Sequence, residues 1–174
     1  MSGKRWFVVI GALAALASVQ AIDAFARRHL VLINRSPSLP NWAYFVERGA
    51  TPVIGDVAFF VPPKNALVAK HFGSAPAAFG KVVYAVGGDV IEHRGDQVLV
   101  HRTTDGVGRP AQLLSLRKRY SARGEVLEAG PIGRVPDGCY YMGSPHKDGF
   151  DSRYAAIGFV CDRQIVGVAR RVIL

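Results

Sequence analysis

Ser38 is the first residue in this sequence whose setting points to nucleophilic chemistry. It lies in the segment 34–40, where Pro37 and Pro40 restrict backbone φ on either side of it. A stiff turn suits a nucleophile because little ordering is needed during the reaction. Taken alone, the same residues also fit a plain Ser-Pro turn, so the assignment depends on finding a base elsewhere in the chain.

Lys81 is the matching candidate for that base. It interrupts the strand-like segment 79–86, in which both faces are otherwise apolar. A buried ammonium group is costly, so such a lysine tends to lose its proton or to find a partner. A neutral amine can then remove the proton of a serine hydroxyl. The alternative is a lysine on an edge strand whose tip reaches water.

A polar segment at 142–154 supplies the third group. Asp151 lies two residues before Arg153, so it could pair with that guanidinium or hold an ammonium in place. The alternative is a solvated loop with a local ion pair, which contributes little to stability.

Together the three segments resemble bacterial type I signal peptidases and their conjugation-specific relatives, the TraF pilin-processing peptidases. The TraF motif is Ser-x-Pro-x-Gly-x-Tyr, and the residues from Ser38 to Tyr44 fit it except that Trp42 replaces the glycine. The family's lysine begins a strand that ends in Gly-Asp eight residues later, as Lys81 does at Gly88-Asp89. The family's late motif ends in Asp-Ser-Arg-Tyr, which is identical at 151–154.

The resemblance implies a role for each matching residue. Ser38 would be the nucleophile, Lys81 the general base and Asp151 a further catalytic participant. The Ser38 N–H and the Ser36 hydroxyl would form the oxyanion hole, and no metal or cofactor would be needed. Supporting positions would be Asp89, Ser152 and Arg153.

Two departures favour the TraF branch over a general signal peptidase. Ser144-Pro145-His146 stands where signal peptidases have Asp-Asn-Arg, and Gly149 stands where they have a serine beside the lysine. The implied function is an endopeptidase that processes a conjugative pilin precursor and could also cyclise it. The expected partners are the prepilin, the inner membrane and other conjugation-apparatus proteins. The alternatives are a general type I signal peptidase and a non-catalytic anchored component of the conjugation channel.

The N-terminal segment predicts export of the remainder of the chain. Lys4 and Arg5 precede an apolar run over 6–22, which is long enough as a helix to cross most of a bilayer core. The segment 1–26 is either a membrane anchor or a signal peptide cleaved after the small-x-small pattern at 24–26. Both interpretations place a peptidase domain, residues 27–174, in the periplasm at the outer face of a bacterial inner membrane.

Residues 27–174 predict a mainly β fold, and the resemblance implies a signal-peptidase-like β-barrel or sheet domain. Apolar, β-branched segments bounded by glycine and proline predict short strands. One or two helical turns are expected over 65–72, and a hairpin around Gly95-Asp96. Residues 103–134 are polar, basic and weakly periodic, which predicts an inserted flap rather than a second core. The expected strands lie at 27–34, 44–46, 55–61, 82–86, 90–92, 98–101, 140–142, 158–161 and 164–172.

Charge and cysteine content exclude some function classes. The formal net charge is +9, but it is spread along the chain apart from a run at Arg117, Lys118, Arg119 and Arg123. No zinc-ligand cluster or aromatic RNA-binding motif accompanies that run, so a solvated or lipid-facing surface is favoured over a nucleic-acid partner. Cys139 and Cys161 are too few for the usual metal spacings, and they could form a disulfide or stay free.

Overall fold

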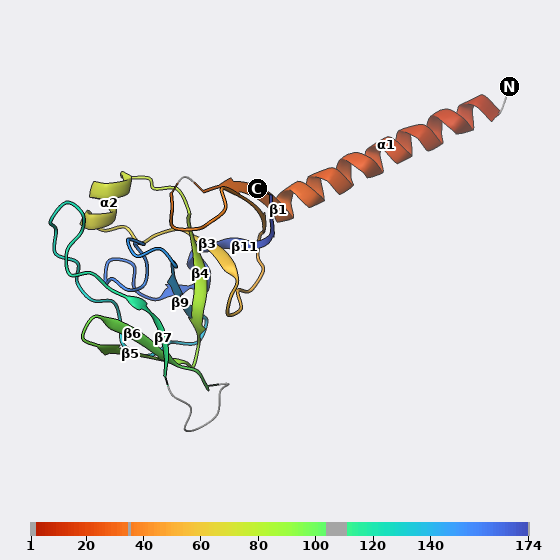
Figure 1. Ribbon diagram of the computed structural model, residues 1–174. Coiled ribbons are helices and arrows are strands. Elements are labelled where there is room, and N and C mark those ends of the chain that lie inside the picture. The colour runs from red at the N-terminus through yellow and green to blue at the C-terminus, as the bar shows by residue number, and fades with distance from the viewer. Residues whose placement is uncertain (1–2, 35, 104–110, 174) are drawn as a thin grey trace.

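The computed structural model describes residues 3–34, 36–103 and 111–173. Arg35 of the Ser38 segment and residues 104–110 of the expected insertion lie outside the described residues. The mainly β prediction is confirmed, with an apolar N-terminal helix (Figure 1). In chain order the elements are α1 (Gly3–Arg28), β1 (His29–Ile33), β2 (Ala43–Glu47), β3 (Val57–Phe60), α2 (Ala66–Phe72), β4 (Phe79–Val86), β5 (Val90–Arg94), β6 (Gln97–His101), β7 (Gln112–Leu116), β8 (Gly133–Arg134), β9 (Cys139–Gly143), β10 (Val160–Cys161), η2 (Asp162–Gln164) and β11 (Ile165–Val172).

The helix α1 projects away from the rest of the chain (Figure 1). Within its segment Trp6–Arg28, an 18-residue window has a mean hydropathy of 1.9 and none of it is buried, so by length and composition the helix could cross a membrane or serve as a signal sequence. The helix continues past the apolar run to Arg28, because residues 23–28 include no helix breaker. Arg27 also donates to Asp23 one turn earlier, at 2.7 Å and 3.0 Å.

Seven strands form the larger sheet, in the order β1-β2-β11-β3-β4-β9-β10. Alternation along β3 sends Ala58 and Phe60 into one buried cluster and Phe59 into another, on the opposite face. The helix α2 covers the first cluster and is capped by Asn65, whose side chain accepts from the Val68 N–H at 3.0 Å. The first cluster contains Ala58, Phe60, Val68, Val83, Tyr140, Met142, Ile157, Val160 and Val168.

A second sheet, in the order β7-β6-β5-β8, packs at the far end of β4. The expected hairpin is present, with Arg94 opposite Gln97 across Gly95. The turn from β4 into β5 is organised by Asp89. Its carboxylate accepts from the Val86 N–H at 3.0 Å and from the Thr103 N–H at 2.9 Å. The supporting position Asp89 is therefore occupied by a buried structural carboxylate.

The described part of residues 103–134 contains two strands that the sequence did not predict. β7 pairs with β6 and β8 pairs with β5, so this stretch supplies two strands of the second sheet. The strands escaped prediction because their side chains are mostly exposed or half-buried and show no alternation. Leu127 is buried, which attaches the rest of the stretch to the domain.

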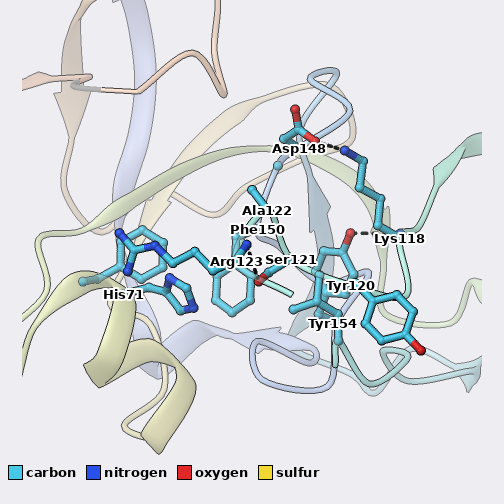
Figure 2. Close-up of a pocket in the computed structure, with 12 residues that line it drawn as sticks. His71, Lys118, Tyr120, Ser121, Ala122, Arg123, Asp148, Phe150 and Tyr154 are labelled. Carbon is cyan, nitrogen blue, oxygen red and sulfur yellow. Dashed lines mark hydrogen bonds and ion pairs between the residues drawn. The ribbon is translucent and has the colours of Figure 1, made fainter. Parts of the chain in front are cut away.

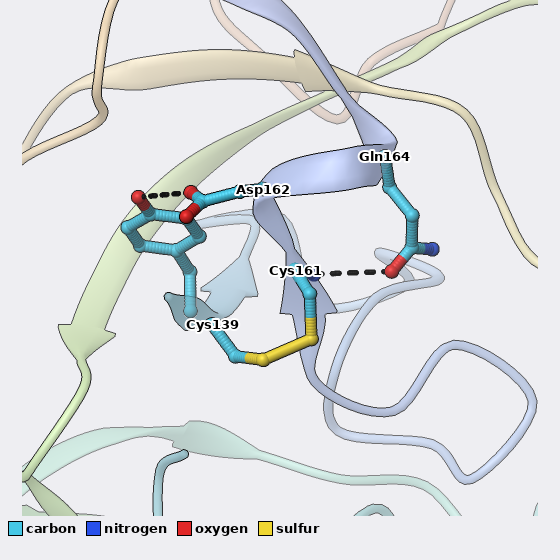
Figure 3. Close-up of a disulfide and its surroundings, with 5 residues drawn as sticks. Cys139, Cys161, Asp162 and Gln164 are labelled. Carbon is cyan, nitrogen blue, oxygen red and sulfur yellow. Dashed lines mark hydrogen bonds between the residues drawn. A yellow bond between two sulfur atoms is a disulfide. The ribbon is translucent and has the colours of Figure 1, made fainter. Parts of the chain in front are cut away.

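A disulfide joins Cys139 of β9 to Cys161 of β10, residues that are directly opposite in the strand pair (Figure 3). The two cysteines are separated by 22 positions. Between the strands runs the segment 144–159, which we call the late loop and which carries the Asp-Ser-Arg-Tyr motif. The disulfide therefore fastens the base of that loop.

Candidate active site

The side chain of Lys81 is buried in the centre of the larger sheet. The residue lies in β4 directly opposite Ala58 of β3, and β9 flanks β4 on its other side. Only 4% of Lys81 is exposed. Burial lowers its pKa from 10.5 to about 8, an effect that the negative charge of Asp151 opposes and the positive charge of Arg153 reinforces. The amine can therefore lose its proton near neutral pH, as a general base must.

Asp151 and Arg153 form a buried pair behind the lysine. The Nε and Nη2 atoms of Arg153 each donate to one carboxylate oxygen of Asp151 at 2.7 Å. The same guanidinium donates to the carbonyls of Leu116 at 2.9 Å and Gly149 at 2.8 Å. This bidentate, fully hydrogen-bonded arrangement is the form in which a buried ion pair is stable. Within the described residues, Asp151 thus binds Arg153 and acts on Lys81 through its charge.

Ser152 fixes the late loop to β9. Its hydroxyl accepts from the Met142 N–H at 3.0 Å, and its own N–H donates to the Met142 carbonyl at 3.0 Å. Ser152 is fully buried, so both hydrogen bonds are shielded from water. The predicted supporting role of Ser152 is therefore structural.

The turn that carries Ser38 is held mainly by one asparagine. The Asn34 side-chain amide donates to the Leu39 carbonyl at 3.1 Å and to the Asn41 carbonyl at 3.0 Å. Its oxygen accepts from the backbone N–H and the hydroxyl of Ser36, both at 3.2 Å. We call residues 36–41 the nucleophile turn, after the role that the sequence predicts for Ser38. Its two hydroxyls meet, since the Oγ atoms of Ser36 and Ser38 lie 2.7 Å apart.

Leu39 and Gly80 bring the nucleophile turn against β4. Leu39 is buried beside Phe59, while Gly80 directly precedes Lys81. A Cβ added at Gly80 would lie 2.7 Å from the Phe59 ring and 3.0 Å from Leu39 Cδ1. Glycine at this position therefore allows Leu39, which follows Ser38, to pack next to the residue that precedes Lys81.

Ser144 connects the nucleophile turn to the late loop. Its hydroxyl donates to the Ser38 carbonyl at 2.5 Å and accepts from the His146 N–H at 3.1 Å. The residue is 1% exposed, so the contact is protected from water. The side chain lies next to Gly149, the position at which the signal-peptidase pattern has a serine. A Cβ at Gly149 would come within 2.6 Å of Ser144 Cβ and 2.5 Å of Arg153 Nη2.

A cavity of about 430 Å³ brings the predicted reacting groups together. Ser36, Ser38 and Lys81 line it, together with apolar side chains that include Phe59 and Phe79. Asp151 does not line it. Among the described residues the structure records no direct hydrogen bond between Ser38 and Lys81, and the Ser38 hydroxyl is hydrogen-bonded to that of Ser36. Such contacts often tighten only when substrate binds.

The sequence did not predict a role for four residues at this site. Two of them hold the nucleophile turn by hydrogen bonds, and two are glycines whose missing Cβ lets other segments come close. Both effects depend on contacts between segments that are far apart in the chain. Only Ser144 and Gly149 gave a signal, as departures from the family pattern. The four are Asn34, Gly80, Ser144 and Gly149.

Comparison with known proteins identifies the family of this chain. The family model described as signal peptidase, peptidase S26, matches residues 3–174. The comparison with curated proteins finds no match. A crystal structure of a signal peptidase I from Enterococcus faecalis is similar at 21% identity, with a TM-score of 0.40, over 68% of this chain and 97% of that chain. In the described residues, no group of three or more His, Cys, Asp or Glu side chains could hold a metal ion. Since the family match covers nearly its whole length, the chain belongs to the signal peptidase family, peptidase S26, and is a serine peptidase of the signal peptidase type.

Proposed function

We propose that the chain is a Ser–Lys endopeptidase in which Ser38 is the nucleophile and Lys81 the general base. One observation carries this assignment. A buried lysine with a pKa lowered to about 8 lines the same cavity as a serine hydroxyl on a tethered turn. A lowered pKa and access to the serine hydroxyl are what a lysine base requires.

The reaction follows the logic of a serine triad with lysine in place of histidine. The Ser38 hydroxyl turns from Ser36 toward Lys81 and gives its proton to the neutral amine. The Ser38 oxygen forms a bond to the peptide carbonyl carbon. The protonated Lys81 then donates that proton to the departing amine, and an acyl-enzyme ester remains on Ser38.

The oxyanion is stabilised by the Ser38 backbone N–H and the Ser36 hydroxyl. One such donor typically lowers the barrier by about 3–4 kcal/mol. The Ser36 hydroxyl already lies 2.7 Å from Ser38 Oγ. Ser144 holds the peptide plane that follows Ser38 by its hydrogen bond to the Ser38 carbonyl. The turn is thereby ordered before substrate arrives, which reduces the entropic cost of the reaction.

For the substrate, we propose a conjugative pilin precursor processed at the outer face of the inner membrane. The Ser38-to-Tyr44 match to the TraF motif supports this, as does Gly149 in place of the signal-peptidase serine. The exposed apolar helix α1 supports a membrane location. In this proposal water resolves the acyl-enzyme to give a linear pilin, or the pilin's own N-terminal amine resolves it to give a cycle.

The test measures the mass of the processed pilin. The prepilin is expressed with the wild-type chain and with Ser38→Ala. We expect a linear mature product or one lighter by a water, and neither product with the variant. Normal processing by Ser38→Ala would refute the nucleophile.

A general type I signal peptidase is equally compatible with the family match. Ordinary secretory preproteins distinguish the two, since a general enzyme cleaves them and a pilin peptidase does not. A non-catalytic channel component would instead leave pilin assembly unchanged in Ser38→Ala and impair it only on deletion.

A further inference from the structure

A second cavity of about 220 Å³ adjoins the Ser38–Lys81 cavity. The two share four lining residues: Phe72, Asp148, Gly149 and Phe150. Two of these are stacked aromatic rings, Phe72 and Phe150, with centroids 5.6 Å apart. Phe150 stacks in turn on Tyr154, at 5.9 Å. A continuous aromatic surface therefore runs from the candidate active site into the second cavity.

The opposite wall comes from the segment 118–127, which is anchored to α2. Glu125 is hydrogen-bonded to His71, to Ser121 at 3.2 Å and to Lys70 at 2.5 Å. These contacts lower the pKa of Glu125 to about 2, the Lys70 contact most strongly. The carboxylate is thus ionised, and its pairing with Lys70 and His71 of α2 holds this wall in place.

Two cations and one carboxylate lie at the rim of the second cavity. Lys118 is paired with Asp148, and the second rim cation is Arg123 (Figure 2). Arg123 is exposed, and within residues 3–34, 36–103 and 111–173 its guanidinium has no carboxylate partner. Figure 2 shows Arg123 near His71, at the other end of the cavity from the Lys118–Asp148 pair. The cavity thus combines an aromatic floor with a cation available for a hydrogen-bonded anion.

We propose that this cavity is a substrate subsite that receives an acidic side chain of the polypeptide being cleaved. The inference rests on the proposed peptidase function, because the occupant is the same chain that reaches Ser38. The methylene groups of an aspartate or glutamate would lie on Phe150 and Tyr154. Its carboxylate would accept from the Arg123 guanidinium, which is suited to bidentate binding of carboxylates.

Size and continuity favour a peptide side chain over a free small molecule. Ligand sites for small molecules are typically about 300–1,000 Å³, larger than this cavity. A single side chain of a polypeptide that already occupies the Ser38–Lys81 cavity needs less room than a whole ligand. It also loses less translational freedom on binding than a separate ligand would.

The experiment uses the full chain with Ser38→Ala in detergent micelles, so that binding is measured without cleavage. The probes are fluorescent alanine-rich peptides with one glutamate placed at successive positions on either side of an Ala-Ala bond. Glutamine and lysine peptides are the matched controls. Affinity is read by fluorescence anisotropy, and cleavage by the wild-type chain is followed separately by mass spectrometry.

We expect one glutamate position to tighten binding about tenfold relative to glutamine, the size of one charge-assisted hydrogen bond. Arg123→Glu should remove that gain and favour the lysine peptide at the same position. Arg163→Glu makes the same charge change on η2, away from both cavities, and should keep the glutamate preference.

A flat glutamate scan, no binding by any peptide, or an equal effect of Arg163→Glu would overturn the subsite. Cleavage of the peptides without an acidic preference would keep the proposed function and reject the subsite. Arg123-dependent binding of the glutamate peptide, together with normal prepilin processing by Ser38→Ala, would keep the acidic-side-chain site and reject the proposed function.

Discussion

The nucleophile turn and the strand that carries Lys81 line one cavity but are held in different ways. The turn is tied by polar contacts from Asn34 and Ser144, and Ser36 within it is exposed. Lys81 is fixed by a central strand, with a buried ion pair behind it. The Ser38 hydroxyl therefore lies on a partly exposed turn, while the Lys81 amine is buried in the sheet. A Ser–Lys site needs this asymmetry, since only the lysine must lose its water.

The largest effects should come from removing each reacting group. Ser38→Ala and Lys81→Met should both lower kcat by about 10⁴- to 10⁶-fold. Their stabilities should differ. Ser38→Ala should change the free energy of unfolding by less than about 1 kcal/mol. Lys81→Met should raise it at pH 7 by up to about 3 kcal/mol, because the buried ammonium is gone.

Peptide cleavage measures the two kcat values, and urea unfolding measures the two free energies of unfolding. A Lys81→Met chain that unfolds more easily than wild type would show that the buried amine stabilises the fold. The proposed difference, in which Lys81 is held at a cost in stability and Ser38 is not, would then be wrong.

Restoring the family serine at position 149 should disturb the late loop that supports both Ser38 and Lys81. At Gly149, the Cβ of Gly149→Ser would meet the Arg153 guanidinium and Ser144, so we expect a loss of about 1–3 kcal/mol in unfolding free energy and reduced cleavage. Ala155→Ser, at an exposed position of the same loop, is the control and should be neutral. Thermal unfolding compares the pair. Equal stability of the two variants would contradict the crowding seen at Gly149.

The pH dependence should follow the lysine. Below pH about 8 the neutral fraction of Lys81 rises with pH, so kcat/KM should rise up to tenfold per unit and then level off. The folded-state pKa is lowered from 10.5, so the unfolded chain holds more protons between pH about 8 and 10.5. Raising the pH through that window should therefore increase stability.

Lys81→Met isolates the lysine in this measurement, because other groups titrate in the same window. The difference in unfolding free energy between wild type and the variant should shrink from pH 8 to 10.5. A constant difference would mean that Lys81 does not titrate there.

The smallest effect expected is that of Ser144→Ala. Loss of one hydrogen bond to the Ser38 carbonyl should lower kcat about threefold to tenfold with little change in KM. Ser152→Ala removes a comparable buried hydrogen bond, from the Met142 N–H, without touching the nucleophile turn. It should cost similar stability and leave kcat unchanged. Equal kinetic losses in the two variants would assign Ser144 a purely structural role.

The sequence could predict those features that follow from the pattern of neighbouring residues. Apolar residues on both faces of 79–86 indicated a buried Lys81, and the structure leaves 4% of it exposed. It could not predict the pairing of β7 and β8, whose side chains lack alternation. The tether from Asn34 and the crowding at Gly149 also escaped it. These depend on how closely segments far apart in the chain approach, and a single sequence does not encode that as a pattern.

The Cys139–Cys161 bond makes a closed ring of the chain segment that holds Ser144, Asp151 and Arg153. For a ring of 22 positions, the reduced number of unfolded conformations is worth about 3 kcal/mol. Thiols stay reduced in the bacterial cytoplasm and oxidise outside it. With the proposed periplasmic location, we therefore expect freshly made chains to have a more loosely fastened late loop than chains that have reached the periplasm. Proteolytic competence would then mature together with transport, which limits cleavage of unintended substrates during synthesis.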